Sequence, residues 1–96
     1  WPVTEGGNGF EVYVSYSRPS PVAQRINVYK YNPSQPLTEI LVTTFDIPAG
    51  TWTWTHPLDH DFDRGQQASV GQDNLGSVDP DDDPAEGLLI IVRIAA

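Results

Sequence analysis

The chain has 96 residues, with 13 acidic and 5 basic side chains, a formal net charge of −8 at neutral pH and no Cys. This length fits a single domain, and the lack of thiols excludes disulfides, thiolate zinc sites and Cys nucleophiles. The longest apolar run, Leu88–Val92, is far shorter than the roughly 20 residues of a membrane-spanning helix.

The negative charge lies in one segment of the chain. Nine acidic residues and one basic residue fall between Asp59 and Glu86, whereas the remaining residues carry four of each sign. A field of this sign repels phosphate backbones and anionic lipid headgroups. We therefore expect no nucleic-acid partner and no insertion into membranes.

Alternation of apolar and polar residues predicts β-strands, because successive side chains of a strand point to opposite faces. Short strands separated by Pro/Gly turns, with no helical spacing of apolar residues, favour a sandwich or a small barrel. The predicted strands are Phe10–Tyr16, Gln24–Tyr31, Leu37–Ile47, Thr51–Thr55, Gly87–Ala95 and, more weakly, Gln66–Gly71.

We expect one all-β domain over residues 1–96, a small antiparallel β-sandwich of Ig-like or jelly-roll-like type with about five to seven strands and no substantial helix. Residues 1–9 are predicted to form a flexible lead-in, and residues 56–65 and 72–87 to form acidic loops. The chain starts at Trp1 rather than Met, which favours a proteolytic cut or an artificial boundary over a natural start.

The closing strand is apolar on both sides. Leu89, Ile91 and Arg93 alternate with four apolar residues that share the other face. A nearly continuous apolar strand has both faces covered. Two explanations stay open: a central position beneath a loop, or contact with another subunit through Leu89 and Ile91. The second explanation predicts self-association or a protein partner.

Two acidic stretches hold the candidate metal ligands, which are Asp59, Asp61, Asp63, Asp81 and Asp83. Carboxylates at alternate positions resemble the start of a calcium-binding loop. The first stretch departs from an EF-hand, because its sixth position is Arg64 rather than Gly and its twelfth is Val70 rather than Glu. Calcium held by both stretches, if they meet in space, is one interpretation. Solvated loops that bind no cofactor are the other.

The sequence contains no recognisable catalytic motif. It has no Gly-x-Ser-x-Gly nucleophile elbow and no Gly-rich phosphate-binding loop. His56 and His60 are four apart, but Pro57 between them excludes the helical spacing of metal ligands. A metal site built from both His residues with Asp61 or Asp63 is a distant alternative. We expect a protein that is not an enzyme and has no catalytic residues.

Aromatic side chains are the candidate binding residues. Trp52 and Trp54 share one face of a strand, where they form either a platform for sugar rings or, in the favoured interpretation, part of the core. Tyr13, Tyr29 and Tyr31 point away from the predicted core residues. Such tyrosines occur at binding surfaces and on ordinary sandwich surfaces alike.

The strand pattern resembles, without a shared motif, the β-sandwich modules of surface adhesins, carbohydrate-binding modules and viral decoration or fibre proteins. It favours a non-enzymatic structural or assembly module on an extracellular or virion surface, of the decoration, fibre or appendage type. The alternative is a carbohydrate-binding or adhesive module that calcium assists. Fold alone does not separate these hypotheses, because sandwiches host unrelated functions.

Overall fold

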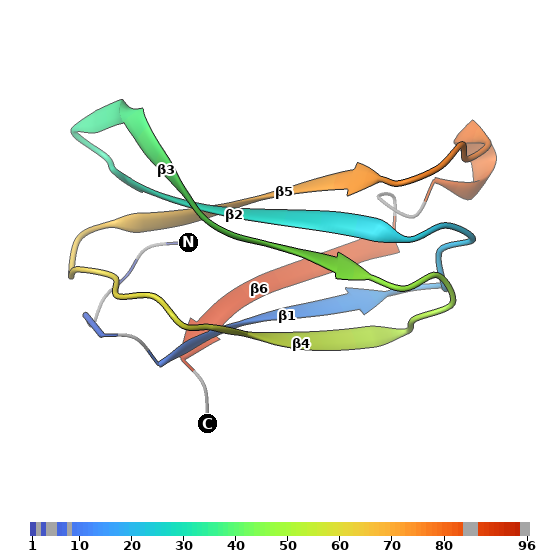
Figure 1. Cartoon of the computed structure of the whole chain (residues 1–96), viewed down its shortest axis with the longest axis horizontal. Helices are drawn as coiled ribbons and strands as arrows, with labels where there is room; N and C mark the ends of the chain where they lie inside the picture. The colour runs from blue at the N-terminus through green and yellow to red at the C-terminus, as the bar shows by residue number, and fades with distance from the viewer. Residues whose placement is uncertain (2, 4–5, 8, 84–86, 95–96) are drawn as a thin grey trace.

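The computed structural model describes residues 1, 3, 6–7, 9–83 and 87–94, and for residues 36–38 and 82 the backbone alone. Its strands pair antiparallel in two three-stranded sheets, so the expected all-β sandwich is confirmed (Figure 1). One sheet has the order β4-β1-β6 and the other β3-β2-β5. The elements are β1 (Phe10–Tyr16), β2 (Gln24–Asn32), β3 (Gln35–Ile47), β4 (Thr53–Leu58), β5 (Gln67–Asn74), the 3₁₀ turn η1 (Pro80–Asp82) and β6 (Leu88–Ile94).

Helical structure in this described part of the chain is limited to short 3₁₀ turns, at η1 and at Gly87. No helix there is long and apolar enough to cross a membrane.

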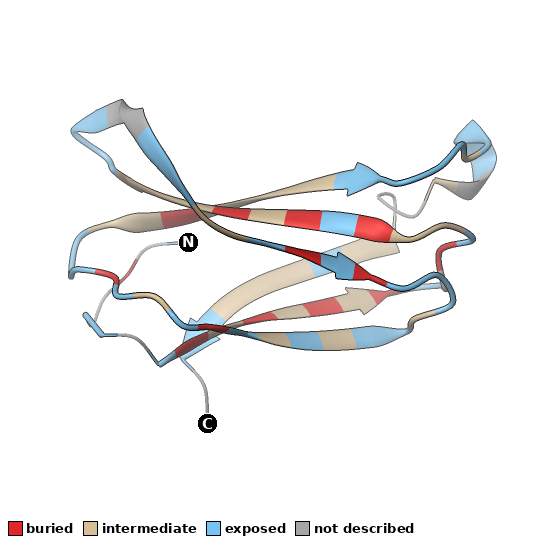
Figure 2. Cartoon of the chain, viewed as in Figure 1, coloured by how far each residue is buried: buried red, intermediate tan, exposed pale blue. Residues whose placement is uncertain are grey.

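The core lies between the two sheets, and the central strands β1 and β2 supply its middle. Figure 2 shows buried positions alternating along both strands. Val12, Val14, Ile26 and Val28 have no exposed surface. Burying one such side chain is worth about 1.5–3 kcal/mol relative to leaving it exposed. The inward face of the two central strands is therefore a main source of the stability of the fold.

Aromatic contacts join elements that are far apart in sequence. Phe62, in the loop between β4 and β5, is 1% exposed and meets Phe10 of β1 edge to face, with ring centroids 5.2 Å apart. Phe45 of β3 stacks on His56 of β4 across the sandwich. The first contact holds the acidic loop against the end of one sheet, and the second connects the two sheets.

The N-terminal segment, predicted as a flexible lead-in, is packed against the start of β5 where the structure describes it. Val3 is buried, its amide donates to the Gln66 carbonyl at 2.9 Å, and the Ala68 amide donates to the Trp1 carbonyl at 2.8 Å. Gly7 and Phe62 exchange two backbone bonds. The segment runs along the start of β5 because the two stretches thereby pair backbone N–H and C=O groups that would otherwise lack partners. Residues 2, 4–5 and 8 lie outside the described residues.

The two acidic loops are shorter than predicted. β4 continues to Leu58 and β5 extends from Gln67 to Asn74, so the connections span 59–66 and 75–87 rather than 56–65 and 72–87. Pro57 can stand in β4 because it lies opposite Glu11 at a position whose amide faces the open edge of the sheet, where a missing N–H costs no ladder bond. Residues 84–86 lie outside the described part.

Candidate functional site

The closing strand β6 lies at the edge of its sheet, next to β1 and to no other described strand. Of the two explanations left open for this strand, the central position is therefore wrong. That position belongs to β1, whose alternation of buried and half-buried residues is unbroken. In contrast, no residue of β6 is fully buried (Figure 2). An apolar strand thus forms an edge that the fold leaves uncovered among the described residues.

Backbone hydrogen bonds at the end of the sheet show which groups of β6 face β1 and which face the open edge. The Ser17 amide donates to the Gly87 carbonyl at 2.8 Å, and the Tyr16 amide donates to the Trp52 carbonyl on the opposite side of β1 at 2.9 Å. Bonded and non-bonded pairs alternate along an antiparallel ladder. The odd-numbered residues of β6 therefore bond back to β1. The N–H and C=O groups that point to the open edge are those of Leu88, Ile90, Val92 and Ile94.

The outward side chains of β6 combine apolar surface with one neutralised charge. Leu89 is 54% exposed and Ile91 beside it is half-buried. Arg93 pairs with Glu11 of β1 at 3.3 Å and lies over the Tyr13 ring, 4.6 Å from its centroid. The two predicted interface residues thus lie on the outer face of an edge strand whose single charge already has a partner.

A small apolar hollow lies at the C-terminal end of β6. It has a volume of about 90 Å³ and is lined by Gly6, Gly7, Gly9, Phe10 and Ile94. Ile94 is 54% exposed. The hollow exceeds the volume that a single water needs, and glycines form most of its wall. It has room for the branched end of an aliphatic side chain.

The two tryptophans have different environments, and the favoured expectation that both enter the core is wrong for Trp52. Trp54 stands opposite Val14 and packs against the core, although its indole N–H has no partner among the described residues. Trp52 is 59% exposed. It lies in the bend just before β4, one residue ahead of Thr53, where the strand begins. The structure therefore does not support a platform made of both rings.

The three tyrosines lie on the outer faces of the central strands, and all are half-buried. A Cβ atom at Gly71 would stand 4.0 Å from Tyr29 Cε2, so the Tyr29 ring covers the bare backbone of a glycine in β5, as aromatic residues often do in sheets. The Tyr31 hydroxyl donates to Gln67 Oε1 at 2.7 Å. Together with the Arg93–Tyr13 contact, these interactions mean that each tyrosine contacts a neighbouring strand of its own sheet.

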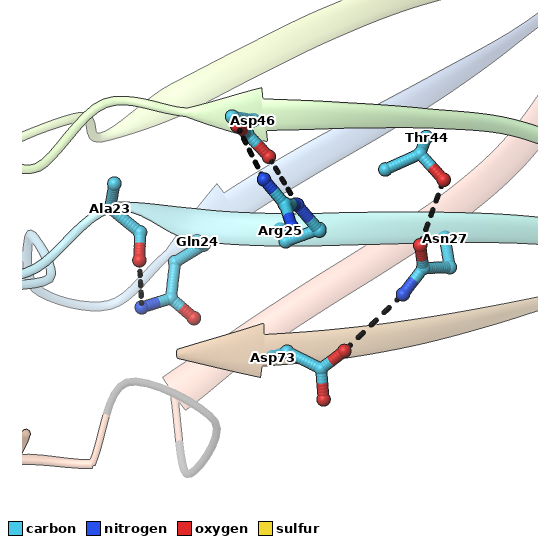
Figure 3. A network of polar contacts seen from close by, with 7 residues as sticks. All are labelled: Ala23, Gln24, Arg25, Asn27, Thr44, Asp46 and Asp73. Atoms are coloured by element: carbon cyan, nitrogen blue, oxygen red, sulfur yellow. Dashed lines mark hydrogen bonds and ion pairs between the residues drawn. The ribbon is translucent and has the colours of Figure 1, made fainter. Parts of the chain in front are cut away.

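Polar contacts connect the three strands on the outer face of the β3-β2-β5 sheet (Figure 3). Arg25 of β2 donates to both carboxylate oxygens of Asp46 in β3, at 2.9 and 3.2 Å, which lowers the pKa of Asp46. Asn27 accepts from Thr44 at 2.9 Å and donates to Asp73 at 3.3 Å. The polar side chains on this half of the face hydrogen-bond to one another, whereas the outer surface of β6 is largely apolar.

The two acidic stretches lie at opposite ends of the sandwich, in the loop after β4 and around η1 (Figure 1). Asp59, Asp61 and Asp63 are exposed on one end, and Asp81 and Asp83 belong to the other. Carboxylates of both stretches therefore cannot share one cation. No group of three potential metal-ligating side chains occurs among the residues searched, which are the described ones. The other interpretation, two solvated loops, stays a prediction.

The two histidines contact different aromatic rings. His56 stacks on Phe45 at a centroid distance of 4.1 Å, and burial lowers its pKa. His60 meets Phe62 edge to face at 5.7 Å, and its Nε2 is buried without a partner in the described structure. Both imidazoles therefore have packing roles in the sandwich.

One exposed apolar surface is absent from our sequence-based candidates. Ile40 and Leu41 of β3 are 56% and 53% exposed. They lie next to an irregularity in pairing, where β3 has one residue more than β2 between Val28 and Tyr29. The signal in the sequence was the run of apolar residues on both sides of this strand, which a strand with one buried face does not need.

Comparison with known proteins adds no family to this description, because no family model, curated protein or solved structure matches the chain.

Proposed function

We propose that this protein is a non-enzymatic structural or assembly module, and that it joins a larger extracellular or virion assembly by accepting a further β-strand at the edge of β6. One observation carries the proposal: a seven-residue strand, apolar apart from Arg93, is open along its edge among the described residues. Unpaired backbone groups on an exposed apolar edge are a template for pairing with another chain. The extracellular or virion location rests on the sequence alone.

The other edges of the two sheets support this interpretation, because they carry protection that β6 lacks. β4, the opposite edge of the same sheet, presents Thr53, Thr55 and Pro57 on its outer face, and a proline blocks the addition of a strand. The start of β5 is paired with the N-terminal segment. β3 departs from regular pairing at two places. Edge protection of this kind is how soluble proteins avoid unwanted pairing.

The first experiment is the solution mass of the domain by light scattering over a wide range of concentration. We expect association that grows with concentration. A single strand pair buries little area compared with the roughly 1,200–2,000 Å² of a standard interface. Association should therefore be reversible upon dilution. A monomer at every concentration would contradict assembly through contacts of the domain with itself.

A matched pair of variants tests whether the edge of β6 is responsible. Val92→Pro removes an N–H that points to the open edge, whereas Thr55→Pro removes the equivalent N–H on the opposite edge strand β4. We expect the first to abolish association and the second to leave it unchanged. Equal association of the two variants would place the contact elsewhere on the surface.

A second pair covers the case in which proline disturbs the fold. Leu89 and Thr53 flank the same residue of β1, Ser15, on the outer face, and both are exposed. Leu89→Lys should weaken association because a charge on an edge strand opposes pairing. Thr53→Lys should have no such effect, and circular dichroism should show both variants folded.

Trp52 favours a second candidate function, that of a carbohydrate-binding or adhesive module. A large aromatic side chain with 59% exposure is a stacking surface for a sugar ring or for another apolar ligand. On a glycan array, Trp52→Ala should then lose the retention shown by the wild type, and Ile40→Ala, which removes a comparably exposed apolar group, should keep it. A wild type that retains no glycan would reject this candidate.

A further inference from the structure

We infer that the strand accepted at the edge of β6 is β6 of a second copy, paired antiparallel with Ile91 opposite Ile91 of that copy. The inference rests on the proposed assembly function and adds to it the partner, the orientation and the register. The result is one continuous sheet with the strand order β4-β1-β6-β6-β1-β4 and a two-fold axis at Ile91.

The backbone of β6 is suited to this pairing because its free groups are arranged symmetrically. The residues directed to the open edge are Leu88, Ile90, Val92 and Ile94, two on each side of Ile91. In the inferred register Leu88 meets Ile94 of the second copy, and Ile90 meets Val92. Every free N–H and C=O of the strand then has a partner, and shifting the register leaves end groups unpaired.

The side chains agree with the same register. On the outer face Ile91 meets its own copy at the axis, and Leu89 lies opposite Arg93 of the second copy. The two Arg93 side chains are then four residues apart along the strands, about 13 Å, which exceeds the screening length of about 10 Å at moderate salt. Each arginine also keeps its own Glu11 partner, so the pairing brings together no unneutralised charges on β6.

The apolar hollow beside Ile94 lies near the end of the inferred pairing. Paired residues of an antiparallel ladder project to the same face, so Leu88 of the second copy projects to the inner face next to Ile94. Ile94 forms one wall of the hollow. This lining of glycines, Phe10 and Ile94 is apolar, so Leu88 of the second copy extends an apolar surface there while it packs against its own core.

Cysteine cross-linking tests the register directly, because the chain contains no Cys of its own. Facing residues of a non-hydrogen-bonded pair have Cα atoms about 4.5 Å apart, a separation that a disulfide spans. Under mild oxidation Ile91→Cys should form a covalent dimer. Leu89→Cys alone should not, since its two copies would be four residues apart, but a mixture of Leu89→Cys and Arg93→Cys should cross-link.

The outcomes separate this inference from the proposed function. Cross-linking of Leu89→Cys with itself, without cross-linking of Ile91→Cys, overturns the register. Association that depends on Val92 but yields none of these disulfides overturns the two-fold pairing and leaves assembly through the β6 edge intact. A wild type without any association overturns the second copy as the partner. Adding Val92→Pro to Ile91→Cys should abolish the cross-link. A cross-link that persists in this double variant would show that the disulfide forms by random collision rather than in a paired dimer.

Discussion

The rings of Phe45 and His56 lie parallel, with their centroids 4.1 Å apart and 12° between their planes. Phe45 belongs to β3 of one sheet and His56 to β4 of the other, so this contact crosses the interior of the sandwich. Burial lowers the pKa of His56, because the imidazolium form loses hydration there. The protonation of one side chain is thereby coupled to the packing of the two sheets.

Stability should therefore fall as the pH drops below the ordinary pKa of histidine. The folded-state pKa of His56 is lower than the unfolded value of about 6.5, so between the two values the unfolded chain binds a proton that the folded chain does not. Above about pH 6.5 both states are neutral at this residue and the contribution does not change with pH. Urea midpoints measured from about pH 7.5 to pH 5 should decrease less for His56→Phe than for the wild type. Parallel curves would show that His56 does not carry this dependence.

The contacts of Arg93 should contribute little to stability in spite of their number. Its side chain is 47% exposed and that of Glu11 13%, so solvent screens the ion pair, and the cation–π contact with Tyr13 adds a small amount. We expect Arg93→Ala to lower the free energy of unfolding by about 0.5–1 kcal/mol. A double-mutant cycle with Glu11→Gln at low and high salt measures the coupling. Coupling that does not weaken with salt would contradict a screened pair.

Ser20 should matter more than its size suggests, because it satisfies a buried amide. Ser20 is 4% and Gln24 1% exposed, and Gln24 Nε2 donates to Ser20 Oγ at 2.9 Å. The Ser20 hydroxyl itself donates to the Val22 carbonyl at 2.6 Å. Ser20→Ala should therefore cost about 1–3 kcal/mol in chemical denaturation, since buried polar groups lose partners. The exposed Ser34→Ala is the control and should change stability by less than about 0.5 kcal/mol.

Two isoleucines give a matched test of the core. Ile26 has no exposed surface and Ile40 is 56% exposed, although both belong to strands of the same sheet. Ile26→Ala should destabilise the domain by about 2–5 kcal/mol through lost burial and a cavity. Ile40→Ala should change the denaturation midpoint only slightly. Comparable losses would mean that the surface of β3 is covered in solution.

Period-two alternation predicted the strands and the inward faces well. The bounds of β1 agree with the prediction, and its four inward residues are buried as expected. The agreement has a local cause, since the face that a side chain takes depends on the strand itself. The same reasoning failed at Trp52, because β4 begins two residues later than the predicted strand, and at Val3, which is buried outside any predicted strand.

The candidate site was predicted in part. Leu89 and Ile91 were identified from the apolar character of both sides of the closing strand, but the sequence left open whether another element covers them. The predicted joint use of the acidic stretches required a distance that no local pattern contains, and the structure separates them. Ile40 and Leu41 were overlooked because an apolar run that is buried and one that is exposed have the same composition.

The sequence by itself determined the class of the fold, the faces of the central strands and the restriction of charge to one segment, because these follow from local periodicity and composition. The tertiary structure alone decided which strand is a neighbour of which, and so which strand forms an open edge. The physical reason is that backbone N–H and C=O groups are the same in every strand. Strand order is therefore settled by the packing of all side chains together, and that packing assigns the centre of the sheet to β1 and its edge to β6.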